Sequence, residues 1–169
     1  MHIFAGARWP TRPPLALGLS PIRSGSQIDL RADPPVYWRP DGEPLTSSER
    51  TRAMVVEDDD ALSALMATVL EEAGYEIRCA PDGAQAVVVL ETWHPDVIVL
   101  DLRMPRMDGW RFREAQRANP DLCDIPVVVV SALTHLHEQA SVLDPAEVVA
   151  KPFELDDLLA AIARTAGRS

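Results

Sequence analysis

Five short apolar runs alternate with helix-like segments between residues 53 and 169, and this alternation limits the fold more than any other feature. Each run is short enough to be a strand, and all except the one at residues 75–80 are followed directly by a polar or charged residue. Strands that alternate with helices form a parallel sheet covered on both faces. The sequence therefore predicts an α/β fold with strands near residues 53–56, 75–80, 97–100, 127–130 and 147–150.

Helical periodicity is clearest after the first run, where six apolar residues recur at intervals of three and four: Leu62, Leu65, Met66, Val69, Leu70 and Ala73. We expect Asp59 or Asp60 to cap this helix and Gly74 to end it. The other helices are expected near residues 84–93, 110–117, 135–142 and 155–162.

The first 52 residues differ from the rest, because they hold 8 of the 15 prolines and no helical or strand periodicity. Proline at this density removes backbone donors and blocks helices and central strands. We expect residues 1–52 to be a disordered tail and residues 53–169 to form one folded domain. Three aromatic residues are unusual in such a tail, and we expect them to collapse weakly onto the domain: Trp9, Tyr37 and Trp38.

Charge and cysteine content narrow the classes of function. Residues 1–52 contain seven arginines and five acids, a formal charge of +2. Since the whole chain carries −10, residues 53–169 carry −12. A DNA-binding surface is usually basic, so we expect no direct DNA binding by the domain.

No apolar run reaches the roughly 20 residues that span a membrane. Cys79 and Cys123 form no disulfide or zinc motif, so we expect a reducing, cytoplasmic location.

Chemistry-bearing residues follow four of the five runs. Glu57 and Asp58 follow the first, Asp101 the third, Ser131 the fourth and Lys151 the fifth. Because the carboxyl ends of parallel strands share one edge, these side chains should lie together. Clustered carboxylates repel one another, and Mg²⁺, which prefers oxygen ligands, removes that conflict. A carboxylate nucleophile, a magnesium site, a hydroxyl and an ammonium together indicate phosphoryl transfer onto aspartate.

Lys151 stands out by composition as well as by position. Fifteen of the 16 basic residues are arginine, and Lys151 is the only lysine. An ammonium is a compact, mobile charge that arginine does not reproduce. We interpret its presence as functional.

Four segments, each at a predicted strand end, resemble the response-regulator receiver domain of two-component signalling across residues 53–169. The resemblance implies a flavodoxin-like fold, with strand order 2-1-3-4-5 and five helices wound on both faces. The matching segments are Met-Val-Val-Glu-Asp-Asp at 54–59, Val-Ile-Val-Leu-Asp-Leu-Arg-Met-Pro at 97–105 with Met-Asp-Gly at 107–109, Val-Val-Ser-Ala at 129–132 and Val-Ala-Lys-Pro-Phe at 149–153.

The resemblance also implies roles for the residues at the strand ends. It makes Asp101 the phosphoacceptor, Ser131 the switch hydroxyl and Lys151 the partner of the phosphoryl group, with a cis bond before Pro152. The implied Mg²⁺ ligands are Glu57, Asp58, Asp101 and the backbone carbonyl of Arg103. The implied phosphodonor is a histidine kinase or a histidine phosphotransfer protein.

Two features of the sequence bear on how a phosphorylated domain would pass on its signal, and two other functions compete with the receiver. The family usually has an aromatic residue three positions before the lysine, whereas this chain has Val148, so a ring switch is not expected. No effector motif follows Ile162, and we expect a stand-alone receiver that signals to an unknown downstream protein and is not a turnover enzyme. A phosphatase of the haloacid dehalogenase type needs a second acid two residues after the nucleophilic aspartate. Arg103 stands at that position, so this class of enzyme is disfavoured. A phosphorylation-independent receiver-like adaptor remains the alternative function.

Overall fold

A computed structural model describes residues 50–132 and 143–167. Five parallel strands form one sheet in the order β2-β1-β3-β4-β5, which confirms the predicted fold class and strand order. The predicted tail up to residue 49 and the helix near 135–142 lie outside the described residues. The elements are β1 (Arg52–Val56), α1 (Asp60–Glu72), β2 (Glu76–Ala80), α2 (Gly83–Leu90), β3 (Val97–Asp101), α3 (Gly109–Ala118), β4 (Val127–Ala132), β5 (Glu147–Lys151) and α5 (Leu155–Ala166).

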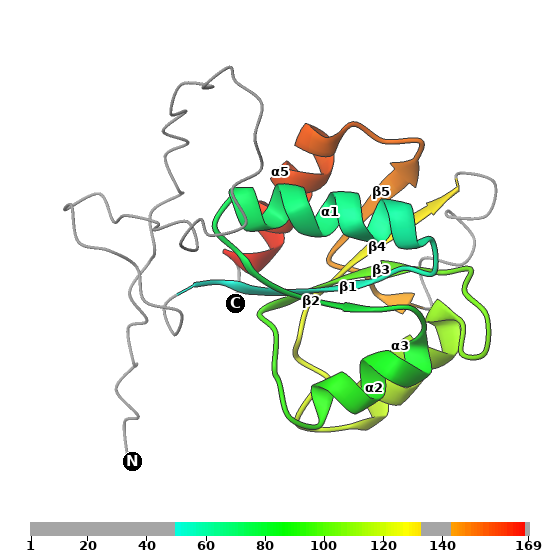
Figure 1. Cartoon of the computed structure of the whole chain (residues 1–169). Helices are drawn as coiled ribbons and strands as arrows, with labels where there is room; N and C mark the ends of the chain where they lie inside the picture. Colours follow the sequence, from blue (N-terminus) through cyan, green and yellow to red (C-terminus); the bar gives the residue numbers. More distant parts are fainter. Residues whose placement is uncertain (1–49, 133–142, 168–169) are drawn as a thin grey trace, which may run out of the picture.

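Helices cover both faces of the sheet, with α1 and α5 on one side and α2 and α3 on the other (Figure 1). The central strand β1 is apolar throughout because it serves both layers. Met54 and Val56 pack in the core beneath α2 and α3, whereas Ala53 and Val55 pack in the core beneath α1 and α5. A strand buried on both faces needs a continuous apolar run rather than alternation.

Helix α1 begins at Asp60, one residue earlier than a cap at Asp60 would require. Asp59 is the N-cap residue, and its Oδ1 accepts hydrogen bonds of 2.9 Å from the backbone N–H groups of Ala61 and Leu62. Gly74 follows the helix with φ of 94°, a conformation that glycine adopts without steric cost. The predicted apolar stripe is wider than the buried face, since Leu65 is 47% exposed.

Two other boundaries differ from the sequence prediction. Helix α2 ends at Leu90 rather than Trp93, and the buried Trp93 indole instead donates a 3.0 Å hydrogen bond to Oε1 of Glu76. Strand β1 starts at Arg52, one residue inside the predicted tail, where Arg52 lies opposite Glu76 in β2. The side chains of these two residues also form an ion pair of 3.3 Å.

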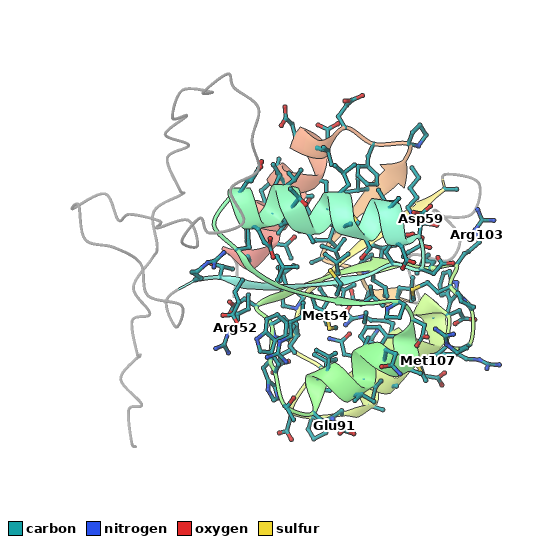
Figure 2. The ribbon with its side chains drawn as sticks, viewed as in Figure 1. Arg52, Met54, Asp59, Glu91, Arg103 and Met107 are labelled. Carbon is teal, nitrogen blue, oxygen red and sulfur yellow. The ribbon has the colours of Figure 1, made fainter. Side chains whose placement is uncertain are left out.

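The acidic residues that follow the strands lie at one end of the sheet, where the strands finish. Figure 2 shows Asp59 and Arg103 at the end where the strands finish and Arg52 at the opposite end. No helix among the described residues is both long and apolar enough to cross a membrane. The carboxyl edge of the sheet is therefore the place to look for the site.

Candidate functional site

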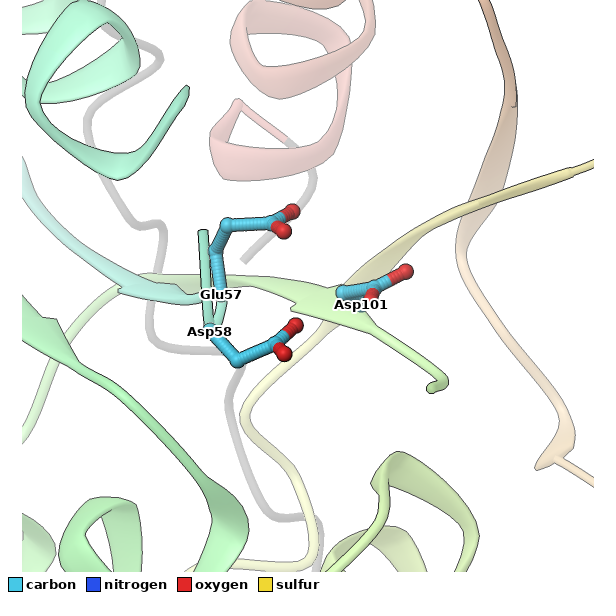
Figure 3. A group of neighbouring side chains, drawn as sticks. All are labelled: Glu57, Asp58 and Asp101. Atoms are coloured by element: carbon cyan, nitrogen blue, oxygen red, sulfur yellow. The ribbon is translucent and has the colours of Figure 1, made fainter. Parts of the chain in front are cut away.

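Three carboxylates gather where β1 and β3 end. The two strands are parallel neighbours with Val56 opposite Leu100, so the residues that follow them come out side by side. One oxygen from each of Glu57, Asp58 and Asp101 lies within 4.8 Å of the other two (Figure 3). Asp58 is exposed, whereas Glu57 and Asp101 are buried. The structure thus brings together the three carboxylates that the sequence analysis selected as metal ligands.

Lys151 reaches this cluster from the end of β5. Its Nζ lies 2.7 Å from Oε2 of Glu57, to which it donates a hydrogen bond, and 3.4 Å from Oδ1 of Asp101. Strand β4 separates β5 from β3 in the sheet, so the lysine side chain spans the end of β4 to make these contacts. The one ammonium therefore interacts with two of the three carboxylates.

The raised pKa of Glu57 reflects the cost of burying several carboxylates together. Burial raises the pKa of the Glu57 carboxyl above its usual 4.5, and the negative charge of Asp101 raises it further, although Lys151 and a backbone N–H oppose both effects. The single ammonium does not offset the desolvation of this carboxylate. A divalent cation would supply the missing positive charge.

The remaining predicted residues lie near the same edge. Ser131 is buried near the end of β4, opposite Ala150, and the next residue in β4 lies opposite Lys151. Arg103 lies in the loop that follows Asp101, with an exposed side chain. Val148 lies in β5 and is 41% exposed. The roles of Ser131 and of the Arg103 carbonyl stay predictions.

The loop after Asp101 is held close to the end of β3. The Gly109 N–H donates a 3.1 Å hydrogen bond to the Leu102 carbonyl. A Cβ at position 109 would lie 2.4 Å from the Asp101 carbonyl oxygen, so only glycine fits there. On the other side of the site, the bond between Lys151 and Pro152 is cis, as the resemblance implied.

The donor set fits Mg²⁺. All three side chains offer carboxylate oxygens, with no nitrogen or sulfur ligand among them, and hard cations prefer such ligands. One exposed carboxylate, Asp58, leaves the cluster open to solvent, and Mg²⁺ typically retains several water molecules.

Comparison with known proteins now places this site in a family. The model of the response regulator receiver domain matches residues 53–163. The chain belongs to the response-regulator receiver domain family. Among solved structures, the chemotaxis response regulator CheY4 of Vibrio cholerae is similar, with a TM-score of 0.65 and 25% identity over 69% of this chain and 98% of that one. The carboxylate cluster thus lies at the carboxyl edge of the sheet in a domain of this family.

A second solved receiver is described with a bound metal ion. The receiver domain of the sensor histidine kinase PA1611 from Pseudomonas aeruginosa PAO1 has a magnesium ion in its active site cleft, according to its description. It has a TM-score of 0.64 and 26% identity, over 70% of this chain and 98% of that one. The cation described in that receiver is the one that the donor set here favours.

Curated relatives are longer proteins. The DNA-binding dual master transcriptional regulator RpaA of a Synechocystis species is 32% identical over 113 residues, which are 66% of this chain and 47% of that protein. The response regulator MprA of a Mycobacterium species is 35% identical over 111 residues, 64% of this chain and 47% of that protein. The chain spans about half the length of the curated relatives it matches.

Sequence reasoning missed the polar residues that support the site loops. Asp82 lies just before the helix predicted near residues 84–93, and its side chain is fully buried, caps α2 and forms an ion pair with Arg106. Arg113 lies in the helix predicted near residues 110–117, to which the sequence assigned no contacts, and the structure shows it buried and donating to the Leu143 and Asp144 carbonyls. The Pro-Asp-Gly sequence at 81–83 was a usable signal for the cap, whereas nothing in the sequence marks the long-range partners.

Proposed function

We propose that this receiver domain accepts a phosphoryl group on Asp101 from a histidine kinase or a histidine phosphotransfer protein, in the presence of Mg²⁺. The observation that carries the proposal is the distance of 3.4 Å between Lys151 Nζ and Asp101 Oδ1, inside a cluster whose carboxylate oxygens lie within 4.8 Å. A nucleophilic carboxylate, a cation site and a mobile ammonium are the groups that phosphoryl transfer needs.

The transfer step follows from the chemistry of the donor. An Asp101 carboxylate oxygen attacks the phosphorus, and the new P–O bond forms as the P–N bond to the donor imidazole breaks. The imidazole nitrogen keeps the electron pair of that bond and takes a proton from solvent. The product is an acyl phosphate on Asp101 and a free histidine on the donor.

Each of the other groups has a task in this step. When bound between Glu57, Asp58, Asp101 and the Arg103 carbonyl, Mg²⁺ would offset the charge of the transferred oxygens. Lys151 would leave Glu57 and donate to a phosphoryl oxygen, since charge-assisted hydrogen bonds of this kind are strong. Ser131 offers a hydroxyl that rotates toward the same group.

The output is proposed to be protein–protein contact in the cytoplasm, with no turnover of an external substrate. Phosphorylation adds about −1.5 to −2 charges at the edge of the sheet. Val148, where relatives usually have an aromatic residue, is too short to follow the hydroxyl inward. Two outputs remain. Either the loop after Ser131 moves without a ring switch, or this face changes little and the protein passes the phosphoryl group on as a carrier, which is the output we favour.

A transfer assay tests the proposal. A protein that carries phosphohistidine is mixed with the chain, and the label on each protein is followed with time. We expect label to move to the wild-type chain with Mg²⁺ and not to the Asp101→Asn variant. No transfer from either a small phosphodonor or phosphohistidine would favour the phosphorylation-independent adaptor instead.

A further inference from the structure

Asp82, at the start of α2, uses its two carboxylate oxygens for two different tasks. Oδ1 accepts a 2.8 Å hydrogen bond from the Gln85 N–H and so caps the helix. Oδ2 accepts from Arg106 Nε and forms an ion pair with Nη2 of the same guanidinium. The Asp82 side chain is fully buried, so this carboxylate has both of its oxygens satisfied within the protein. Capping explains only one of these contacts.

Arg106 lies in the loop that leads from Asp101 to α3, and its backbone is in an unusual conformation. Its φ is 64°, in the left-handed region that costs a residue with a Cβ of order 1 kcal/mol or more. Its side chain is 64% exposed, so burial of apolar surface does not account for this conformation. The contact with Asp82 is the interaction that holds the residue in place.

A second contact joins the same two segments. The Gly83 N–H donates a 3.0 Å hydrogen bond to the Met107 carbonyl. A Cβ at position 83 would lie 2.7 Å from Met107 Cγ, so the loop and the helix start are in close apposition. The middle of the loop is therefore fastened to α2, while its ends are fastened to β3 and to α3.

We propose that the ion pair between Arg106 and Asp82 is a positioning device for the magnesium site. It holds the loop of residues 102–108 against the start of α2 and so fixes the Arg103 carbonyl, three residues before Arg106, beside Asp58 and Asp101. This inference rests on the proposed function. Arg106 and Asp82 are positioning residues, since neither is among the groups that contact the metal.

The physical reason is preorganisation. A backbone carbonyl on a loop is a good ligand only if the loop is already in place, because otherwise binding must also order the loop. Removal of the groups that orient metal ligands typically weakens metal binding 10- to 100-fold. Leu102 and Met104 are buried and anchor the start of the loop, whereas Arg103 and Pro105 are exposed. The Arg106 contact would therefore set the exact position of the Arg103 carbonyl on a loop that the core already holds nearby.

Simple electrostatics predicts the opposite result, which makes the inference testable. Removing a positive charge near a cation site should strengthen Mg²⁺ binding slightly. A positioning role requires that loss of the Arg106 guanidinium weakens binding. The direction of the change thus separates the two explanations.

The variant must keep the backbone conformation while losing the ion pair. Arg106→Asn does so, because asparagine tolerates the left-handed region better than other residues with a side chain. Arg106→Lys keeps the charge but loses the two-nitrogen contact with the carboxylate. Arg111→Gln is the matched control, because it removes the same charge from an exposed side chain in the first turn of α3.

The experiment is calorimetric titration of Mg²⁺ into the full chain, with circular dichroism to confirm that each variant is folded. We expect Kd to rise about tenfold in Arg106→Asn, to take an intermediate value in Arg106→Lys and to stay within twofold of wild type in Arg111→Gln. An unchanged or tighter Kd in folded Arg106→Asn would overturn the positioning role, and the proposed function would stand. If wild type binds Mg²⁺ but accepts no phosphoryl group, the proposed function fails, and the comparison of Kd still tests the positioning role.

Discussion

Lys151 and Glu57 are 94 positions apart in the chain, yet Nζ of the lysine lies 2.7 Å from Oε2 of the glutamate. The same ammonium is 3.4 Å from Asp101, so in this structure Glu57 is its closer partner. Glu57 is only 3% exposed and accepts this contact in a desolvated position. Phosphorylation of Asp101 would therefore have to draw the lysine away from Glu57.

The first prediction concerns the pH dependence of this pair without metal. Since burial raises the pKa of Glu57 above 4.5, the folded chain holds that proton more tightly than the unfolded chain. Folding stability from this group is therefore lost as pH rises through the interval above 4.5. We expect the free energy of unfolding of wild type, relative to Glu57→Gln, to fall between about pH 4 and pH 7.

Denaturant titrations in EDTA at several pH values measure this difference. The comparison with Glu57→Gln cancels the other titrating groups, and the glutamine retains an acceptor for Lys151. A difference that is constant with pH, or that favours wild type more strongly at pH 7 than at pH 4, would contradict the account.

The second prediction separates two adjacent acids with different roles. Asp59 caps α1, so Asp59→Ala should lower the free energy of unfolding by about 1 kcal/mol and leave the stabilisation by Mg²⁺ intact. Asp58 belongs to the carboxylate cluster and is exposed, so Asp58→Ala should cost little stability and remove most of the Mg²⁺ response. Melting temperatures of both variants with and without Mg²⁺ provide the test. Equal responses in the two variants would disprove Asp58 as a direct ligand.

The third prediction concerns the buried Arg113. Its guanidinium donates to the carbonyls of Leu143 and Asp144 and to Oε1 of Gln116, at 2.6 to 3.0 Å. Arg113→Met keeps most of the apolar volume but leaves these acceptors unpaired, so we expect a loss of roughly 2–3 kcal/mol in the free energy of unfolding.

Urea unfolding measures this loss, with Arg111→Met as the control at an exposed site of the same helix. The control should lie within about 0.5 kcal/mol of wild type. Similar values for both variants would mean that the Arg113 contacts contribute nothing.

The fourth prediction concerns the proline-rich tail. A segment of this composition buries little apolar area, so deletion of residues 1–49 should leave the melting temperature and phosphorylation nearly unchanged. Deletion of residues 1–52 should cost stability, because Arg50 donates a 3.1 Å hydrogen bond to the Gly74 carbonyl and Arg52 pairs with Glu76. A marked loss on deletion of 1–49 alone would show that the aromatic residues of the tail pack on the domain.

The alternation of apolar runs with helical segments predicted the parallel sheet and the edge that carries the candidate site, whereas the strand order came from the family resemblance. Apolar runs buried on two faces leave little choice of element, and the strand ends then place Glu57, Asp58, Asp101 and Lys151 on one edge. Boundaries were less certain where an apolar residue serves a turn. Trp93 was assigned to a helix for its apolarity, but it packs beyond the end of α2 and bonds to Glu76.

The supporting contacts could not be predicted for a different reason. Arg106 and Asp82 are 24 positions apart, and Arg113 and Leu143 are 30 apart, with no repeat or spacing that relates them. Arginine and aspartate are mostly exposed in folded proteins, so the residue type alone does not indicate that one of them is buried. The position of α2 beside the loop that leads to α3 brings Asp82 to Arg106, and the position of α3 beside the segment before β5 brings Arg113 to Leu143.

Intact-mass spectrometry after incubation with a small phosphodonor is the most direct test that Asp101 is the phosphoacceptor. The account predicts that wild type gains the mass of a single phosphoryl group with Mg²⁺ present and none in EDTA. Asp101→Asn should remain folded and gain nothing. Full phosphorylation of the Asp101→Asn variant, or labelling of wild type that persists in EDTA, would contradict it.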